Sequence, residues 1–322
     1  MLHKIKVIKM RASLAEGVAG IGTVMLHHRR LQLPRGLRTR FAPSPTGYLH
    51  LGHVAAAVYV WGLAQAAEAE VHVRIEDHDR QRCRPEYTAA LVEDLIWLGF
   101  LPGTARVEEL STQSQHPERY AAALAVLDTQ ELVYACTCSR RQQIERLASP
   151  EPLGEVRYDG YCRDRKQARY EAGLRLKLAP ETHGFDDLFQ GPQSQCPSKQ
   201  CGDLLVFDRH QNWTYNFCVV VDDDRERIDM VIRGLDLIEA TGRQLQLAKL
   251  LGATSPRYWL HHPLILAEDG RKLSKRFGSS ALRTLRDQGH TSQDVLGMAA
   301  RAVGLISSER PLEVSSLGEL FS

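Results

Sequence analysis

The chain has 322 residues, 43% of them hydrophobic and 25% charged, and its formal net charge is only +2. This length suits one large domain or two smaller ones, and the small net charge does not by itself indicate a nucleic-acid-binding protein. No apolar stretch is both long enough and free enough of charge to span a bilayer, so we expect a soluble protein with no membrane partner.

Residues 1–36 are predicted to be an extension outside the fold. Lysines and Arg11 precede a mildly apolar run over residues 14–26, which superficially resembles a signal peptide. Glu16 and several glycines interrupt this run, and no small-residue cleavage site follows it. We therefore expect a disordered segment here, or translation that starts at Met10 or Met25, and a cytoplasmic protein.

The first half of a nucleotide-binding domain is expected over residues 37–113. A strand is predicted at residues 40–42, and the prolines and glycine that follow force a turn. Helical spacing of alanine, valine and leucine predicts a helix over 51–69, and VHVRI at 71–75 predicts the next strand. A strand–loop–helix–strand unit of this kind begins a parallel sheet of the Rossmann type.

The rest of the chain is expected to form three parts: an insertion that interrupts the sheet, the second half of the sheet, and a short tail. Residues 114–205 are predicted to be an insertion, helical at 117–130 and partly β beyond. Two strands, at 204–207 and 216–221, and a helix ending at Leu251 indicate that 206–262 is the second half of the domain. Residues 263–322 are expected to form a basic loop and a short helical region. The predicted fold class is α/β.

The segment PSPTGYLHLGH, residues 43–53, places two histidines where a strand turns into a helix. Helix N-termini combine unpaired N–H groups with the positive end of the helix dipole, so phosphate binds there readily. Gly52 removes a side chain that would block an adenine or ribose. His50 and His53 can donate to phosphate oxygens as charge moves to a leaving pyrophosphate. The alternative is a pair of capping histidines.

The sequence KLSKR, residues 272–276, follows a turn at 268–270 and predicts a second phosphate-contacting element. Lys272 and Lys275 are flexible point charges that suit the β- and γ-phosphates of ATP. A basic loop alone is usually just solvated. HLGH followed about 220 residues later by KLSKR, however, is a pairing that simple solvation of the basic loop does not account for.

HLGH and KLSKR resemble the two signature sequences of class I aminoacyl-tRNA synthetases. The longer string RTRFAPSPTGYLHLGH, with RIEDHDRQR downstream, resembles the glutamyl-tRNA synthetase branch, and the likeness runs from about Arg38 to about Leu285. The resemblance implies a Rossmann-type catalytic domain that binds ATP through His50, Gly52, His53 and Lys275. It also implies that L-glutamate is activated with ATP and Mg²⁺ before any tRNA binds.

The resemblance further implies a glutamate pocket, in which Glu76 would hold the substrate ammonium. Arg233 would bind the side-chain carboxylate bidentately, which is a physical reason to prefer glutamate to glutamine. The alternative is that Glu76 and Arg233 form a structural ion pair and that Tyr215 belongs to the core. The implied pocket residues are Arg40, Phe41, Ala42, Pro43, Ser44, Glu76, Tyr215 and Arg233.

Seven unevenly spaced cysteines fit a reducing compartment with a metal site better than a disulfide framework. Cys136, Cys138 and Cys162 have the pattern of three ligands of a tetrahedral structural zinc site, and buried free thiols are the alternative. The resemblance implies that the fourth ligand is Tyr158, because one subgroup of the family has a tyrosine ligand at this place. Tyr161 is the local rival.

The length of the chain after KLSKR bears on which molecule accepts the activated glutamate. Only 46 residues follow Arg276, too few for the anticodon-reading region of full-length glutamyl-tRNA synthetases. The chain therefore resembles a truncated subgroup that transfers glutamate to the queuosine base at the wobble position of tRNA(Asp). We expect a monomeric ligase of this kind. The alternatives are a minimal synthetase that charges a tRNA 3′ end and a non-catalytic paralogue that binds glutamate or tRNA for regulation.

Overall fold

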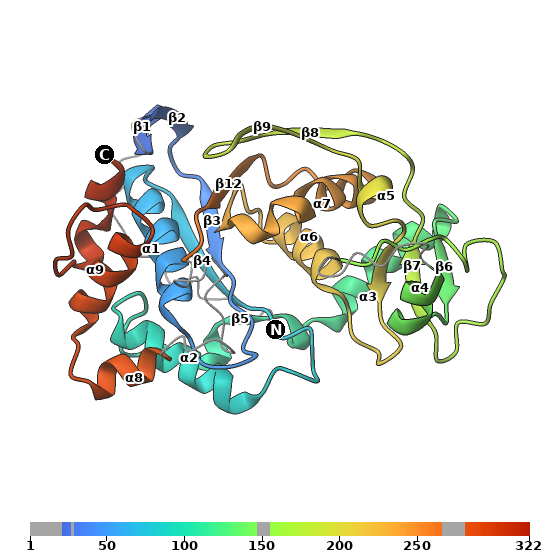
Figure 1. The fold of residues 1–322 in the computed structure, drawn as a ribbon, viewed down its shortest axis with the longest axis horizontal. Coiled ribbons are helices and arrows are strands. Elements are labelled where there is room, and N and C mark those ends of the chain that lie inside the picture. The colour runs from blue at the N-terminus through green and yellow to red at the C-terminus, as the bar shows by residue number, and fades with distance from the viewer. Residues whose placement is uncertain (1–20, 27–28, 147–154, 266–280) are drawn as a thin grey trace, which may run out of the picture.

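A seven-stranded sheet forms the body of the molecule in the computed structural model, which describes residues 21–26, 29–146, 155–265 and 281–322 (Figure 1). The strand order is β5-β4-β3-β11-β12-β8-β9, and all neighbours are parallel except the β8–β9 pair. The strands are β3 (Arg38–Phe41), β4 (Glu70–Ile75), β5 (Ser111–Thr112), β8 (His183–Asp187), β9 (Gly191–Gln195), β11 (Met230–Gly234) and β12 (Tyr258–His262). This arrangement confirms the predicted α/β fold class.

Helix α1 (Leu51–Ala66) connects β3 to β4 and is buried along most of its length. Its apolar residues face in every direction, which is typical of a helix enclosed by other elements. It packs on α9 (Ser292–Ala302) and on the 3₁₀ helix η4 (Val314–Phe321). Gly62 permits this contact, because a Cβ there would lie only 2.3 Å from the Phe321 ring. The expected strand–loop–helix–strand unit is therefore present.

The remaining helices cover the sheet and its ends. The longer ones are α2 (Pro85–Trp97), α3 (Pro117–Thr129), α6 (Tyr215–Arg225) and α7 (Ile238–Leu251). The short ones are α4 (Arg140–Arg146), α5 (Pro197–Gln200), α8 (Leu282–Asp287), η1 (Val107–Glu109), η2 (Gln113–Gln115) and η3 (Leu235–Leu237). Across the described ranges, none is long and apolar enough to cross a membrane.

A second sheet of three strands, in the order β10-β7-β6, carries the cysteine-rich segment at the far side of the molecule from α8 and α9 (Figure 1). Its strands are β6 (Val133–Cys136), β7 (Gly173–Leu176) and β10 (Leu204–Phe207). Because β10 pairs with β7, the predicted boundary between residues 205 and 206 wrongly cuts a strand. Strands β8 and β9 also leave the predicted insertion, since Asp187 pairs with Trp259 in the main sheet.

Residues 216–221 form part of helix α6, so the strand predicted there is wrong. This stretch is buried from Phe217 to Asp223 and packs between α3 and α7. A short apolar run that is buried on all sides has no periodicity to separate strand from helix. Packing between two helices then overrides the β preference of its valines.

Residues 21–26 and 29–34 form a hairpin of two antiparallel strands, β1 (Ile21–Leu26) and β2 (Arg29–Pro34), which corrects the disorder predicted for this part of 1–36. Val24 and Leu33 are fully buried, because β1 packs against α1 and η4. The alternation of apolar and polar residues along β2 is the signal that the disorder prediction overlooked. Residues 1–20 lie outside the described part of the chain.

Candidate active site

The two histidines of HLGH meet at the start of α1. His50 is the N-cap, and its Nδ1 accepts a hydrogen bond from the backbone N–H of Gly52 at 3.1 Å. The backbone N–H of His50 donates in turn to Nδ1 of His53 at 3.1 Å, and the ring centroids are 4.0 Å apart. The capping interpretation is therefore correct as geometry. Capping does not prevent phosphate binding. A neutral imidazole that accepts at Nδ1 carries its proton on Nε2, and this N–H can donate to a phosphate oxygen.

Gly52 has a structural role beside the predicted one. A Cβ at this position would lie 2.9 Å from Cε1 and 3.0 Å from Nδ1 of His50. Glycine therefore leaves room for the capping imidazole itself, so the approach of His50 to the helix N-terminus depends on it.

Lys272 and Lys275 lie outside the described residues. Further along the chain, Ala281 forms an isolated antiparallel bridge with His50. The backbone N–H of Leu282 donates to the carbonyl of Leu49 at 2.8 Å. The chain that follows KLSKR thus returns directly to the HLGH segment.

The RFAPS segment contributes mainly its backbone and Arg40. Phe41 is buried with its ring 5.2 Å from Trp61, so its side chain belongs to the core. The carbonyl of Pro43 accepts from the backbone N–H of Glu76 at 3.1 Å, which joins this loop to the end of β4. Ala42 and Ser44 are half-buried in the same loop.

Arg40 is a buried cation at the end of β3. Its Nε donates to Oδ1 of Asp223 at 3.4 Å, and its Nη1 donates to the carbonyl of Ile232 at 3.2 Å. Asp223 lies on α6. The side chain of Arg40 is thus fixed between the sheet and that helix.

Glu76 pairs with Arg74, not with Arg233, so the proposed structural ion pair does not exist in this fold. Nη2 of Arg74 lies 2.9 Å from Oε1 of Glu76 and 2.9 Å from Oδ1 of Asp223, while Nη1 lies 2.7 Å from Glu226. Burial acts to lower the pKa of the fully buried Arg74, but the surrounding carboxylates raise it well above its ordinary value.

Arg74 was missed by the sequence interpretation. The available signal was a charged residue inside VHVRI, where a buried strand otherwise carries apolar side chains. The charge of a buried arginine is most often paired with an acid, and RIED supplies only one of the acidic partners of Arg74 nearby in sequence. The others come from α6 and its C-cap, which pattern analysis could not place beside β4.

Arg233 is also buried, but in its case all partners are neutral. Its Nε donates to His261 Nε2 at 2.9 Å, and its Nη1 donates to Tyr215 Oη at 3.2 Å and to Gln244 Oε1 at 2.8 Å. Its Nη2 donates to Thr241 Oγ1 at 2.8 Å. Within the described residues it forms no ion pair with a carboxylate. Burial accordingly lowers its pKa.

This geometry changes the expected grip of Arg233 on a carboxylate. Four of its five N–H groups point at protein acceptors, which leaves one on Nη2. The hydroxyl oxygen of Tyr215 accepts from Nη1 of Arg233, so the O–H of Tyr215 can act as a second donor beside the remaining N–H of Nη2. A bidentate grip by the guanidinium alone would require one protein acceptor to be released.

A cavity of about 390 Å³ lies between α6, α7 and the loop that follows α7. Asp223 and Gln244, the acceptors that hold Arg40 and Arg233, are part of its lining. Neither Arg40 nor Arg233 lines the cavity, so it lies on the other side of their acceptors Asp223 and Gln244.

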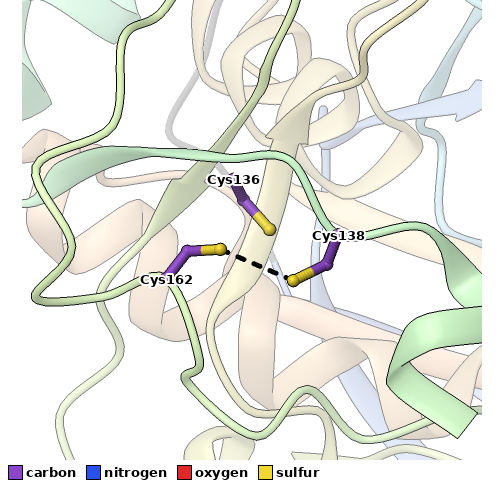
Figure 2. A group of neighbouring side chains, drawn as sticks. All are labelled: Cys136, Cys138 and Cys162. Atoms are coloured by element: carbon purple, nitrogen blue, oxygen red, sulfur yellow. Dashed lines mark hydrogen bonds between the residues drawn. The ribbon is translucent and has the colours of Figure 1, made fainter. Parts of the chain in front are cut away.

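Three thiols converge in the cysteine-rich segment, as Figure 2 shows for Cys136, Cys138 and Cys162. Their sulfur atoms all lie within 4.8 Å of one another, and Cys138 and Cys162 are 3.5 Å apart. Tyr158 Oη lies 3.5 Å from the Cys136 sulfur and accepts from the backbone N–H of Cys162 at 2.8 Å. The rival, Tyr161, is 43% exposed. Tyr158 is therefore the tyrosine that joins the thiol cluster.

Each sulfur also receives an N–H donor from a neighbouring side chain. Arg175 donates to Cys136 at 3.4 Å and Arg146 donates to Cys138 at 3.4 Å. Gln167 donates to Cys162 at 3.2 Å. Donors of this kind stabilise thiolates and orient metal ligands, so the residues present fit a metal ion with sulfur ligands.

Together, the parallel sheet, the HxGH cap at the first crossover helix and the buried charges at the strand ends define a nucleotide-dependent ligase of the class I synthetase type. The comparison with protein families agrees: residues 36–310 match the model described as tRNA synthetases class I (E and Q), catalytic domain. The chain belongs to this family.

Known proteins with similar sequences include two named glutamyl-Q tRNA(Asp) synthetase and one named glutamate–tRNA ligase. Glutamyl-Q tRNA(Asp) synthetase from Nitratidesulfovibrio vulgaris is 37% identical over 286 residues, which are 84% of this chain and 87% of that protein. The protein of the same name from Rhodobacter capsulatus is 38% identical, over 83% of this chain and 99% of its own length. A glutamate–tRNA ligase from Nitrosomonas europaea is 38% identical over 82% of this chain, but only 57% of its length is covered.

A solved structure shares the fold at lower sequence identity. Glutamate tRNA ligase from Elizabethkingia meningosepticum superimposes with a TM-score of 0.72 at 23% identity. The match covers 89% of this chain and 65% of that one. It supports the class I architecture of the backbone.

Proposed function

We propose that this chain activates L-glutamate with ATP as the aminoacyl adenylate and transfers glutamate to the queuosine base of tRNA(Asp). The observation that carries the first half is the buried Arg233, which forms no ion pair with a described carboxylate. Burying a charge is costly, so a site of this kind is suited to an anion that arrives with the substrate. The side-chain carboxylate of glutamate is such an anion.

The roles of the pocket residues follow from their places. Glu76 accepts from the substrate ammonium, while Nη2 of Arg233 and the hydroxyl of Tyr215 each donate one hydrogen bond to the side-chain carboxylate. This end-on grip still separates glutamate from glutamine, because the amide would place an NH₂ against two donors. The α-carboxylate then attacks the α-phosphorus of ATP in line, and pyrophosphate leaves.

Phosphate charge is stabilised from two sides in this proposal. His50 and His53 donate from Nε2 at the positive end of α1, and Lys272 and Lys275 supply cations from the KLSKR segment. Mg²⁺ bound to the triphosphate would neutralise further charge. The bridge between Ala281 and His50 supports this arrangement, because it joins the chain after the KLSKR segment to the HLGH segment.

We assign the thiol cluster to one structural Zn²⁺ held by Cys136, Cys138, Cys162 and Tyr158. Three sulfur donors and one phenolate oxygen complete a tetrahedral set, which leaves no position for a substrate. The ion would then hold β6, α4 and the loop before β7 together, and it would take no part in the chemistry.

The acceptor is proposed from the relatives. The two proteins named glutamyl-Q tRNA(Asp) synthetase are matched over 87% and 99% of their lengths. Transfer to a base of tRNA(Asp) distinguishes this proposal from the charging of a tRNA 3′ end.

Two assays test the proposal in order. The first is glutamate-dependent ATP–pyrophosphate exchange in the absence of tRNA, which we expect for the wild type and for Arg257→Ala, a surface control. Arg233→Ala should abolish it. No exchange in a folded, zinc-loaded wild-type sample would favour a regulatory protein.

The second assay follows labelled glutamate into purified tRNA(Asp) with and without queuosine. We expect label only in the queuosine-containing tRNA, and the label should stay when periodate has blocked the 3′ end. Equal labelling of the two tRNAs would instead establish 3′-end charging.

A further inference from the structure

A carboxylate lies near Arg233, but an imidazole separates the two. Nε2 of His261 accepts from Nε of Arg233 at 2.9 Å, and Nδ1 of His261 lies 2.6 Å from Oδ2 of Asp187. The side chains of His261 and Asp187 have no solvent exposure. The three residues come from adjacent parallel strands, since β12 lies between β11 and β8.

The donors and acceptors allow only one protonation pattern. Arginine can only donate, so Nε2 of His261 has to accept and its proton sits on Nδ1. That proton is donated to Asp187, which as a carboxylate can only accept. Burial lowers the pKa of His261, and the charges of Arg233 and Arg40 lower it further against the opposing effect of Asp187. The row is therefore carboxylate, neutral imidazole, guanidinium.

Asp187 is itself held in place at the end of β8. Its Oδ1 accepts from the backbone N–H groups of Phe189 at 3.0 Å and Gln190 at 2.7 Å, and its Oδ2 accepts from the N–H of His261 at 3.1 Å. Although burial acts to raise the pKa of Asp187, the hydrogen bond from the His261 side chain and those from the backbone N–H groups of Gln190 and Phe189 hold it below its ordinary value. The carboxylate can thus fix the tautomer and the plane of the imidazole.

We propose that His261, held in one tautomer by Asp187, is a positioning residue that orients Arg233 and so determines the selection of glutamate over glutamine. This inference rests on the proposed function. If Asp187 paired directly with Arg233, the pocket cation would already be neutralised. The neutral imidazole supplies an acceptor that orients the guanidinium, while most of its charge remains for the substrate carboxylate.

Two substitutions at His261 separate its two contacts. The side chain of His261→Gln can place its amide oxygen near Nε2 and keep the acceptor for Arg233. That of His261→Asn reaches only the position of Nδ1 and loses this acceptor. We expect His261→Asn to raise the KM for glutamate by about 10- to 100-fold, the factor for one lost hydrogen bond to a charged group, with a smaller change in kcat. The preference for glutamate over glutamine should fall with it, and His261→Gln should retain more of both.

Asp187→Asn tests the tautomer. The amide group of the new asparagine can donate to Nδ1 of His261, which moves the imidazole proton to Nε2. That proton then faces the Nε–H of Arg233, so two donors oppose each other. An asparagine in the aspartate position of a protease triad changes the tautomer in the same way. We expect a glutamate KM like that of His261→Asn. The matched control is Asp186→Asn, because Asp186 is an exposed neighbour on the same strand and the change in charge is identical.

A readout that does not depend on activity accompanies these assays. ¹⁵N NMR of histidine-labelled protein should show His261, assigned as the signal that is lost in His261→Asn, with a protonated Nδ1 and an unprotonated Nε2, and this pattern should be reversed in Asp187→Asn. Assignment by the variant is needed because buried His262 also places Nδ1 against a carbonyl, that of Pro263, at 2.8 Å. Folding is checked by thermal denaturation of each variant.

The outcomes are distinct. A wild type without glutamate exchange overturns the proposed function, whatever the NMR shows. This inference is overturned if the wild type is active and the folded variants His261→Asn and Asp187→Asn keep its KM for glutamate and its discrimination against glutamine. A proton on Nε2 of His261 in the wild type overturns it as well.

Discussion

Replacing Arg74 by methionine should destabilise the protein through charge rather than through packing. Arg74 is fully buried and contacts Glu76, Asp223 and Glu226 at 2.7 to 2.9 Å. Methionine fills much of the same volume but leaves these carboxylates without their shared cation. Arg40 still pairs with Asp223, and Arg119 lies 3.7 Å from Glu226, so the cluster is only partly rescued.

The magnitude follows from the burial of the site. Removing one partner of a buried ion pair costs about 3–5 kcal/mol, because the remaining charge stays desolvated. The control is Arg82→Met, which breaks the surface pair with Asp79 at an arginine that is 71% exposed. Such a pair contributes about 0–1 kcal/mol. Thermal denaturation should therefore separate the two variants clearly.

The pH dependence identifies the cause. Burial acts to raise the pKa of Glu226, but Arg74 and His72 hold it well below its ordinary value. In the wild type this carboxylate stabilises the fold above its unfolded pKa, and the contribution is lost as the pH falls through the lowered value. In Arg74→Met burial prevails and raises the pKa of the orphaned carboxylates, so the variant regains stability as the pH falls. The gap between the two proteins should be widest near pH 7 and narrow on acidification, whereas a gap that stays constant with pH would refute the electrostatic reasoning.

Three further predictions concern the site. Gly52→Ala pushes on the His50 ring and should raise the KM for ATP several-fold through loss of a cap interaction of about 1 kcal/mol, while glutamate affinity measured by calorimetry stays unchanged. Tyr158→Phe should lower zinc affinity measured by chelator competition, and Tyr161→Phe should not; equal affinities would exclude Tyr158 as a ligand. The glutamate KM should rise as the pH falls through the lowered pKa of His261, since the imidazolium would oppose Arg233 and Arg40 and would no longer accept from Arg233; a flat acidic limb would contradict this.

The parts of the fold that could be predicted from the sequence are those whose signals are local. Helix α1, strands β3 and β4 and the cysteine cluster are each indicated by a short stretch of residues. The N-terminal hairpin was missed because its apolar alternation is weak beside the charged and glycine-rich residues that precede it. Helix α6 was missed because burial on all sides removes the periodicity on which such predictions depend.

The site shows the same limit. The resemblance named Arg40, Glu76, Tyr215 and Arg233, and the fold brings Tyr215 and Arg233 into contact. It could not name Arg74, His261 or Asp187, since their importance lies in contacts between segments distant in sequence. Asp187 and His261 are separated by 74 residues, yet they meet at 2.6 Å. Only the strand order of the sheet, with β8 beside β12, makes that contact foreseeable.

In the proposed glutamate pocket, the two buried arginines would together hold a zwitterion with a second carboxylate. Arg74 holds Glu76 in place through an ion pair, and Asp223, a second partner of Arg74, also pairs with Arg40. Around Arg233 the hydrogen-bond partners are neutral, and the carboxylate of Asp187 stands behind an imidazole, so much of the guanidinium charge is left for the ligand. One end of the pocket therefore suits an ammonium and the other suits an anion. An uncharged side chain such as that of glutamine would leave the second cation buried and uncompensated, which is a larger penalty than one missing hydrogen bond.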